Sequence, residues 1–345
     1  MKTHNVAIVG GTGYTGSELL RILINHPHVH IQALTSNSHA GKKLTEIHPQ
    51  FNGLLDMELS TIEDLDVDGL DAILLALPHG VSMDFVKKAD YSRCKIIDLS
   101  GDFRLDSVET YEFWYGMKHN FSEGFKDSVY GMPELFRDQI KNAQLIANPG
   151  CFPTGSILPL APLVSKNAIK TSGIVVDAKT GITGAGAKPK LNTHFPNASE
   201  NFSAYGLKKH RHTPEIQDSV SAFSGQDINI TFTPHLLPVN RGILSTIYAD
   251  AVKPLSDSDL KSIYSEFYEN EPFIRVVDTP PSLQHVRGTN YCDIYTTYDE
   301  RTNKVTAISV IDNLVKGAAG AAVQNMNIVL GIEETAGLKL MPAMP

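Results

Sequence analysis

The chain opens with a strand, a glycine-rich turn and a helix, and this opening most narrows what it can fold into. Residues 6–9 are apolar, and a helical pattern runs from Ser17 to Leu23. Such a turn lets a pyrophosphate approach the N–H groups at a helix start. A plain glycine-rich turn is the alternative, but the flanking strand and helix favour a bound dinucleotide. We expect the cofactor to contact Gly10, Gly11, Thr12, Gly13, Tyr14, Thr15 and Gly16.

The end of the next apolar strand, residues 29–34, indicates which dinucleotide is bound. An NAD enzyme commonly places Asp or Glu here to hold the ribose hydroxyls. This chain has no acid there, and Lys42 and Lys43 follow. Hydroxyl and amide groups can accept a 2′-phosphate, which a carboxylate would repel. We therefore predict NADP(H); a solvated polar loop is the alternative. The residues expected to contact the cofactor here are Thr35, Ser36, Asn37 and Ser38.

Further strands are predicted at residues 72–77, 95–99 and 144–147, separated by helical or irregular stretches. This alternation is typical of an α/β domain with a doubly wound parallel sheet. Ligands of such sheets bind beyond the carboxyl ends of the strands. We therefore expect three loops to line one cleft: residues 78–80, 100–104 and 148–151.

The second half of the chain is richer in strands. The predicted strands are residues 174–178, 228–233, 243–251, 273–277, 291–298 and 305–311. Ser256 to Asp259 offers a capping box for a helix that runs to Tyr268, and Thr213 with Pro214 is predicted to start another. This pattern predicts an α+β domain with a mixed sheet. We expect residues 1–150, joined by the C-terminal helix of residues 315–345, to bind NADP, and residues 151–314 to form the catalytic, substrate-binding and dimerisation domain.

Cys151 is the predicted nucleophile. It follows an Asn-Pro-Gly turn, and Pro153 suits the first turn of a new helix. A helix N-terminus favours the thiolate, the form that attacks a carbonyl. Most free cysteines are small buried hydrophobes, and we interpret Cys94 and Cys292 in that way because neither follows such a turn.

Composition excludes several classes of protein. The 345 residues carry a formal net charge of −8, which argues against binding to nucleic acid or an anionic membrane. We find neither a signal peptide nor an apolar run of about 20 residues, so we expect a cytoplasmic protein. Three cysteines suit a reducing compartment, and no ligand spacing suggests a metal.

Several long motifs, in their order along nearly the whole chain, resemble one enzyme family. They are Gly-Gly-Thr-Gly-Tyr-Thr-Gly at 10–16, Asp-Leu-Ser-Gly-Asp-Phe-Arg at 98–104, Tyr-Gly-Met-Pro-Glu-Leu at 130–135, Ala-Asn-Pro-Gly-Cys-Phe-Pro-Thr at 147–154 and His-Arg-His-Thr-Pro-Glu-Ile at 210–216. The segments around residues 234–242 and 317–325 match as well. The chain resembles the N-acetyl-γ-glutamyl-phosphate reductases of arginine biosynthesis, relatives of the aspartate-semialdehyde dehydrogenases.

The resemblance implies a Rossmann domain, a second domain of the glyceraldehyde-phosphate-dehydrogenase-like type and a homodimer or homotetramer. It also implies NADPH-dependent reduction of N-acetyl-L-glutamyl 5-phosphate to the 5-semialdehyde through a thioester on Cys151. It extends the cofactor site to Gly184, Gly186 and Asn325. Two positions depart from the family: Asn37, where an Arg is common, and Lys188, near an expected Arg. The first leaves the degree of preference for NADP over NAD open.

Two histidines are candidates for acid–base catalysis. His210 and His212 lie in a polar loop before a predicted helix, where a histidine pKa stays near neutrality. We favour His212, which Glu215 can orient; a chance surface cluster is the alternative. Arg104 offers a planar charged group for phosphate or carboxylate, although an ion pair with a nearby Asp would also explain it. The residues expected to bind substrate are Arg104, Ser100, Asn148, Glu215 and Arg211.

Three other functions stay open at this point. An aspartate-semialdehyde dehydrogenase would share the thioester chemistry but act on a shorter substrate, and the His-rich motif argues against it. A non-catalytic NADP sensor would not need an activated cysteine. A reductase of the carrier-linked lysine route would bind a small acidic protein, which the negative charge of this chain disfavours.

Overall fold

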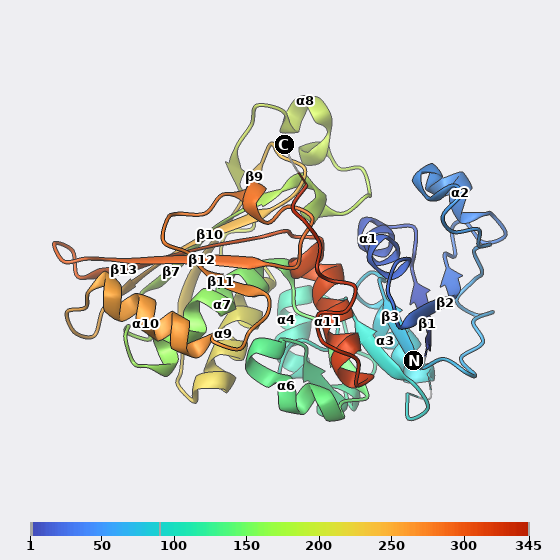
Figure 1. The fold of residues 1–345 in the computed structure, drawn as a ribbon, viewed down its shortest axis with the longest axis horizontal. Coiled ribbons are helices and arrows are strands. Elements are labelled where there is room, and N and C mark those ends of the chain that lie inside the picture. Colours follow the sequence, from blue (N-terminus) through green and yellow to red (C-terminus); the bar gives the residue numbers. More distant parts are fainter. Residues whose placement is uncertain (1–2, 90, 344–345) are drawn as a thin grey trace. The chain divides into compact units, whose positions relative to one another are not determined.

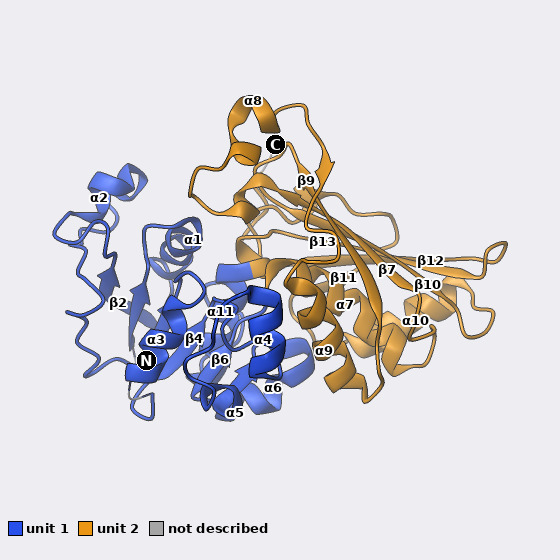
Figure 2. Cartoon of the chain, turned by 180° about the vertical axis from the view of Figure 1, so that it is seen from behind, with its two compact units in different colours: residues 1–149, 318–339 blue, residues 150–317, 340–345 orange. Residues whose placement is uncertain are grey.

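The computed structural model describes residues 3–89 and 91–343, and the chain divides into two compact units (Figures 1 and 2). Unit 1 consists of Met1–Pro149 and Ala318–Lys339. Unit 2 consists of Gly150–Gly317 and Leu340–Pro345. Each unit is built around its own sheet, and we describe them in turn.

Unit 1 contains a six-stranded sheet in the order β2-β1-β3-β4-β6-β5, in which every neighbouring pair is parallel. The expectation of a doubly wound parallel sheet is confirmed. Its strands are β1 (His4–Val9), β2 (Val29–Thr35), β3 (Ala72–Leu75), β4 (Lys95–Asp98), β5 (Ser128–Tyr130) and β6 (Leu145–Ala147).

Helices cover both faces of this sheet. One face packs in an apolar cluster with Met83 and Val86 of α3 and Tyr111 of α4. On the other, α11 contacts β4, α1 and α6. The helices of unit 1 are α1 (Tyr14–Leu23), α2 (Leu44–Ile47), α3 (Val81–Lys88), α4 (Val108–Tyr115), α5 (Gly124–Asp127), α6 (Pro133–Asn142), α11 (Gly320–Val329) and the 3-10 turn η1 (Pro49–Phe51).

Two details of this sheet differ from the sequence prediction. β3 ends at Leu75 rather than at residue 77, because after Ala76 donates to Val9 the chain turns at Pro78, which has no N–H to donate. β5, only three residues long, was not predicted. It is too short to show an alternating pattern, and it lies at the sheet edge beside β6.

Unit 2 contains a seven-stranded mixed sheet in the order β11-β12-β13-β10-β7-β9-β8. This confirms the expected mixed sheet. Its strands are β7 (Ile174–Gly181), β8 (Ser203–Ala204), β9 (Ile230–Leu237), β10 (Ile243–Asp250), β11 (Ile274–Val276), β12 (Cys292–Asp299) and β13 (Lys304–Ile311). β9 extends through Pro234, past the predicted end at residue 233. Pro234 is tolerated because its carbonyl accepts from Tyr205 N–H while the short neighbouring strand β8 needs no N–H from it.

Three long helices lie against one face of this sheet, as Figure 1 shows: α7 (Cys151–Ser165), α9 (His212–Ser224) and α10 (Asp257–Phe267). The predicted capping box of α10 is present, with Ser256 and Asp259 satisfying each other's backbone N–H groups. The remaining elements are the 3-10 turns η2 (Ile182–Ala185), η3 (Leu191–Thr193) and η4 (Leu283–His285), the short helix α8 (Phe195–Ala198) and the π-helix η5 (Val315–Ala319).

α7 continues through Pro159 and Pro162, which cannot donate to the carbonyls of Gly155 and Leu158. Side-chain hydroxyls replace the missing donors. Ser309 Oγ of β13 donates to the Gly155 carbonyl, and Tyr268 Oη, just after α10, donates to the Leu158 carbonyl at 2.5 Å. The helix that begins at Cys151 is therefore fastened by the sheet and by the α10 segment.

The described residues contain neither a helix long and apolar enough to cross a membrane nor a cluster of three His, Cys, Asp or Glu side chains that could hold a metal ion.

Candidate active site

Cys151 is the first residue of α7, as the turn chemistry predicted. Gly150 forms the N-cap with an extended backbone, and no side chain caps the helix. Cys151 is partly exposed, whereas Cys94 and Cys292 are buried. The positive end of a fifteen-residue helix favours the thiolate, and its first-turn N–H groups can bind an oxyanion.

Glu215 joins α9 to the start of α7. Its side chain is fully buried, and Oε1 accepts from the Gly150 N–H at 2.7 Å. Oε2 lies 3.9 Å from His212 Nε2. One carboxylate therefore fixes the backbone that presents Cys151 and faces the imidazole that sequence analysis favoured as the acid–base group.

The start of α9 differs from the prediction. The helix begins at His212 rather than at Thr213, and Arg211 stands at the N-cap without a side-chain capping bond. His212 is only 7% exposed, so it does not lie in an open polar loop. His212 is buried because α9 begins one residue before the predicted start and its first turn packs against α7.

His210 lies beside His212, with 4.8 Å between the ring centroids, and its Nδ1 accepts from the His212 N–H at 3.2 Å. Burial, together with the Arg211 charge, lowers the pKa of His210 to about 4. His210 is therefore neutral at pH 7 and cannot supply a proton there, contrary to the expectation of a pKa near neutrality. His212 remains the candidate for proton transfer.

Tyr205 and Phe152 complete the surroundings of Cys151, and sequence analysis missed both. Burial, with a further contribution from Cys151, raises the pKa of Tyr205, so the phenol keeps its proton. The Phe152 ring lies 5.5 Å from the His210 ring and 6.0 Å from the His212 ring. The only sequence signal was proximity: Phe152 follows Cys151, and Tyr205 precedes the His-rich motif by five residues.

The π-helix η5 lies against Cys151. A Cβ built on Gly317 would stand 2.8 Å from Cys151 Cβ, so only glycine fits. The segment is fixed by Asp312, which is fully buried, accepts from the Leu314 and Gly288 N–H groups and pairs with Arg241 at 3.0 Å. π-Helical turns are frequent at functional sites.

In unit 1, the glycine turn has the form that a dinucleotide site requires. Gly10 has φ +92°, and a Cβ there would meet the Ala76 carbonyl oxygen at 2.5 Å. Added methyl groups on Gly11 or Gly16 would meet Leu34 or the Gly10 oxygen. Gly13 differs: it caps α1 without a side-chain bond, and a Cβ there meets nothing within 4 Å. Open space therefore lies at the start of α1, where a pyrophosphate would sit.

The polar residues after β2 also suit a cofactor. Thr12 Oγ1 and Ser36 Oγ are 2.9 Å apart, and Thr35 Oγ1 is buried without a hydrogen-bond partner among the described residues. Asn37 and Ser38 are exposed, and Asn37 Oδ1 accepts from the Ile62 N–H. Of the two lysines, Lys43 pairs with Asp56, and the structure leaves Lys42 exposed.

Three residues expected to touch ligands are buried in hydrogen-bond networks of unit 1. Ser100 Oγ donates to Asp98, and Asn325 Nδ2 donates to Asn148 Oδ1 at 3.0 Å. Ser100 is 1% exposed, and the two asparagines are not exposed at all. In this geometry they shape the loops that follow β4 and β6, and their roles toward a ligand stay predictions.

The loop from Ser100 to Arg104 is held by buried carboxylates. Burial, with a contribution from Asp102, raises the pKa of Asp98 to about 6. Asp102 accepts from the Gly80 and Met83 N–H groups at the start of α3. Arg104 Nη2 donates to the Leu99 carbonyl at 2.7 Å and is partly exposed.

Gly184 and Gly186 belong to unit 2, at and just after η2. Gly186 has φ +81°, and Thr183 beside them donates to the Asn240 carbonyl. Their predicted contact with a cofactor stays a prediction.

Comparison with known proteins identifies the family of the chain. Residues 5–143 match the family model described as the NAD binding domain of semialdehyde dehydrogenase, and residues 151–313 match its dimerisation domain. Among solved structures, aspartate semialdehyde dehydrogenase II from Vibrio cholerae has a TM-score of 0.74 at 19% identity, covering 96% of this chain and 99% of that one. At that identity the likeness shows the fold alone.

Curated relatives are much closer in sequence. N-acetyl-gamma-glutamyl-phosphate reductase of Pelotomaculum thermopropionicum is 47% identical, over 96% of this chain and 97% of that protein. The protein of the same name from Methanococcus maripaludis is 48% identical, over 99% of this chain and 98% of its own length. The chain therefore belongs to the N-acetyl-gamma-glutamyl-phosphate reductase family.

Proposed function

We propose that this protein reduces N-acetyl-L-glutamyl 5-phosphate to N-acetyl-L-glutamate 5-semialdehyde and phosphate, with NADP(H) as cofactor, as a step of arginine biosynthesis. The observation that carries the proposal is the placement of Cys151 at the start of α7, with Glu215 bonded to the preceding backbone N–H and facing His212. Close relatives that carry the same name support it.

In the first step, the Cys151 thiolate forms a C–S bond with the acyl carbon, and the bond from that carbon to the phosphate oxygen breaks. Phosphate leaves with the bonding electrons, so no proton is needed for its departure. The N–H groups at the start of α7 stabilise the oxyanion that forms on the way. The product is a thioester on Cys151.

When bound, NADPH supplies a hydride to the thioester carbonyl carbon. The residues of the chain then control one proton: His212 donates to the carbonyl oxygen during reduction and takes the proton back as the C–S bond breaks. Aldehyde leaves, and Cys151 is again a thiolate. His210, neutral at pH 7, keeps its Nδ1 as an acceptor for the His212 backbone. Glu215 holds the imidazole in place.

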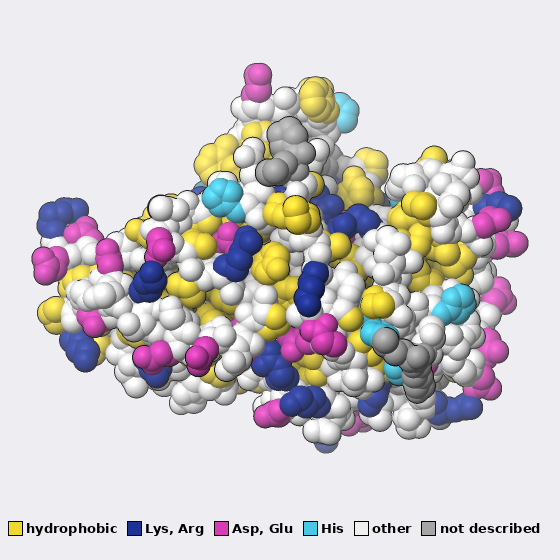
Figure 3. Space-filling model, in the orientation of Figure 1, with side chains coloured by type: hydrophobic (Ala, Val, Ile, Leu, Met, Phe, Trp, Pro, Cys, Tyr) yellow, Lys and Arg dark blue, Asp and Glu magenta, His cyan; other side chains and the backbone are white. Residues whose placement is uncertain are grey.

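The substrate carries negative charge on its phosphate and its carboxylate. We assign Arg104 and Arg211 to these groups, because a guanidinium binds either one through two parallel hydrogen bonds. On the face drawn in Figure 3, Lys and Arg side chains are interspersed with Asp and Glu side chains rather than gathered into one patch. This face therefore differs from the clustered basic patch that is typical of nucleic-acid-binding proteins.

The glycine turn at the start of α1 is the proposed NADP(H) site, since Gly13 leaves open space there and Thr35 offers an unpartnered hydroxyl. We also propose a homodimer or homotetramer, which fits the dimerisation-domain model matched by residues 151–313. The cytoplasm is the proposed compartment, because three cysteines, few and odd in number, suit a reducing environment rather than a disulfide scaffold.

The reaction can be tested in reverse, as phosphate-dependent oxidation of N-acetylglutamate 5-semialdehyde followed at the NADPH absorbance, with NADP and NAD compared. Aspartate semialdehyde is the control substrate. We expect NADP reduction with the acetylated aldehyde only. Activity with aspartate semialdehyde alone would assign the protein to the sister activity, and activity with neither would leave the sensor alternative.

The thioester is tested separately with Cys151→Ser. We expect the variant to lose turnover and to form no acyl adduct detectable by mass spectrometry, while it still binds NADPH. Full activity of this variant would disprove the mechanism. Acylation of a different residue would assign the role of nucleophile to that residue and would still support the proposed reaction.

A further inference from the structure

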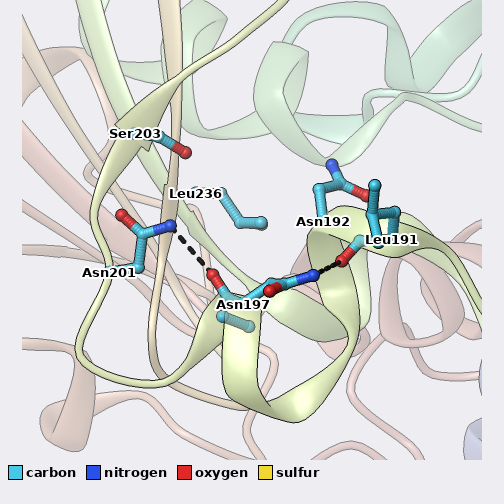
Figure 4. Close-up of a pocket in the computed structure, with 7 residues that line it drawn as sticks. Leu191, Asn192, Asn197, Asn201, Ser203 and Leu236 are labelled. Carbon is cyan, nitrogen blue, oxygen red and sulfur yellow. Dashed lines mark hydrogen bonds between the residues drawn. The ribbon is translucent and has the colours of Figure 1, made fainter.

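A pocket in unit 2, away from the residues that carry the chemistry, has the lining that an acetamido group needs. Its volume is about 390 Å3, within the range of small-molecule sites. Figure 4 shows Leu236 of β9 between Ser203 of β8 and Asn192 of η3, with Asn197 and Asn201 around the rim. Leu191 and Ala198 complete the wall.

Two amide side chains at the rim use their N–H groups in hydrogen bonds within the protein and keep their oxygen acceptors available. Asn197 Nδ2 donates to the Leu191 carbonyl at 2.9 Å, and Asn201 Nδ2 donates to the Asn197 carbonyl at 2.8 Å, as the dashed lines in Figure 4 show. These bonds orient the two side chains while their Oδ1 atoms keep no hydrogen-bond partner among the described residues. The Asn192 amide and the Ser203 hydroxyl are likewise without a partner there, so the pocket offers both donors and acceptors.

The pocket lies on the same face of the sheet as Cys151. Phe232 and Leu236 are four residues apart on β9, so their side chains point to the same face. The Phe232 ring is 5.3 Å from the ring of Phe152, the neighbour of Cys151. Ser203 pairs directly with Leu236, and Tyr205, two residues further, is electrostatically coupled to Cys151.

The interval along β9 can be compared with the length of the substrate. Four residues of strand separate Phe232 from Leu236, roughly 13 Å along β9 at about 3.3 Å per residue. In an N-acetylglutamyl group, six bonds of about 1.5 Å join the reacting carbonyl carbon to the acetyl methyl group, so these atoms lie roughly 7–8 Å apart when extended. A chain of that length therefore spans a little more than half of the interval from Phe232 to Leu236.

We propose that this pocket binds the acetamido end of the substrate and so selects acylated over free amino substrates. This assignment rests on the function proposed above. The amide N–H of the substrate would donate to the Oδ1 of Asn197 or Asn201, its carbonyl would accept from Asn192 or Ser203, and its methyl group would lie against Leu236. A free ammonium group has neither the carbonyl nor the methyl group to offer.

The methyl contact is tested with Leu236→Phe, which fills the apolar wall. The aldehydes compared are the N-acetyl and N-formyl derivatives of glutamate 5-semialdehyde, which differ by one methyl group. We expect the ratio of their kcat/KM values, acetyl over formyl, to fall at least roughly threefold in this variant, the discrimination that one buried methyl group supports. A matched control is Leu255→Phe, at another half-buried leucine of unit 2, which should leave the ratio unchanged.

The polar contact is tested with Asn192→Leu. We expect KM to rise roughly two- to tenfold for both aldehydes, as loss of a neutral hydrogen bond predicts, with little change in kcat. The control is Asn142→Leu at the exposed end of α6. The rate at which iodoacetamide alkylates Cys151 should match wild type in both pocket variants, which shows that the nucleophile is undisturbed.

The outcomes separate this assignment from the proposed function. If the wild type turns over the acetylated aldehyde but Leu236→Phe leaves the acetyl-to-formyl ratio unchanged, the pocket assignment is wrong and the reaction stands. An equal loss with both aldehydes in Leu236→Phe would also overturn it, because that result indicates a general structural effect. A wild type inactive with both aldehydes would refute the proposed function and this assignment together.

Discussion

Gly317→Ala tests whether the close approach of the π-helix to the nucleophile matters. The new Cβ would stand 2.8 Å from Cys151 Cβ, about 0.6 Å inside the 3.4 Å at which ordinary van der Waals contact begins. Neither side yields easily, because Asp312 fixes the π-helix through several hydrogen bonds and α7 is buried from Phe152 to Val164. A shift of roughly half an ångström at the nucleophile then follows.

The expected cost can be estimated from this shift. A displacement of about 1 Å at a reacting group can lower a rate roughly 100-fold, so we expect a loss of roughly tenfold or more in kcat for the reverse reaction. Overpacking typically costs about 1–3 kcal/mol of unfolding free energy, and each 1 kcal/mol corresponds to about 2–4 °C in Tm for a unit of this size.

Gly155→Ala is the matched control for this variant. It lies one turn further along α7, and its added Cβ would approach Ser245 Oγ at 3.3 Å and Ile243 Cγ2 at 3.5 Å, which small side-chain movements accommodate. Kinetics, thermal unfolding and the rate of Cys151 alkylation should be measured for both variants. Wild-type kcat and alkylation rate in Gly317→Ala would refute the argument that this contact positions the nucleophile.

Four further predictions follow from individual contacts. Gly13→Ala should keep the wild-type Tm, because the added Cβ meets no protein atom within 4 Å. It should raise the Kd for NADPH roughly tenfold or more in a fluorescence titration, because that Cβ occupies space proposed for the cofactor. An unchanged Kd would place the pyrophosphate elsewhere. Burial raises the pKa of Asp98 to about 6, so the folded protein binds this proton more tightly than the unfolded chain does. The resulting contribution to the free energy of unfolding, about 3 kcal/mol at most, is fully present below about pH 4 and is lost as the pH rises through about 6. Asp98→Asn should flatten this slope in urea titrations, and an identical slope in both proteins would contradict it. Tyr268→Phe leaves the Leu158 carbonyl without its hydroxyl donor and should cost about 1–3 kcal/mol in urea unfolding; no loss would mean that water replaces the hydroxyl. Glu215→Gln keeps an acceptor for the Gly150 N–H but removes the carboxylate that faces His212. Because the proposed step needs His212 protonated, the alkaline limb of the pH–rate profile should move to lower pH, and an unmoved limb would exclude His212 as its origin.

Local features of the sequence predicted the parts of the fold that depend on neighbouring residues. The glycine turn after β1, the start of α7 at Cys151 and the capping box of α10 each need only a few adjacent residues, and the structure contains all three. The alternation of strands and helices predicted the parallel sheet, and the clustered strands of the second half predicted the mixed sheet.

Contacts between distant residues could not be predicted in this way. Nothing in the sequence near Gly317 indicates that it packs against Cys151, because the contact depends on how η5 follows β13. The low pKa of His210 depends on burial next to Phe152 and Phe232, and a polar sequence such as His-Arg-His suggests the opposite. β8 has only two residues, too few for any pattern.

Glu215 shows why the catalytic arrangement and the fold of unit 2 depend on each other. A fully buried carboxylate is costly unless its oxygens find donors, and Gly150 N–H at 2.7 Å is one of them. Glu215 meets that donor only when α9 packs on α7 with His212 at the start of α9, since His212 and Glu215 are three residues apart on one helix face. The bond that lowers the cost of burying the charge therefore also brings the imidazole toward the cysteine. Cys94 and Cys292 have the same thiol but are buried, so the placement of the backbone around Cys151, rather than the residue type, suits it to the proposed role of nucleophile.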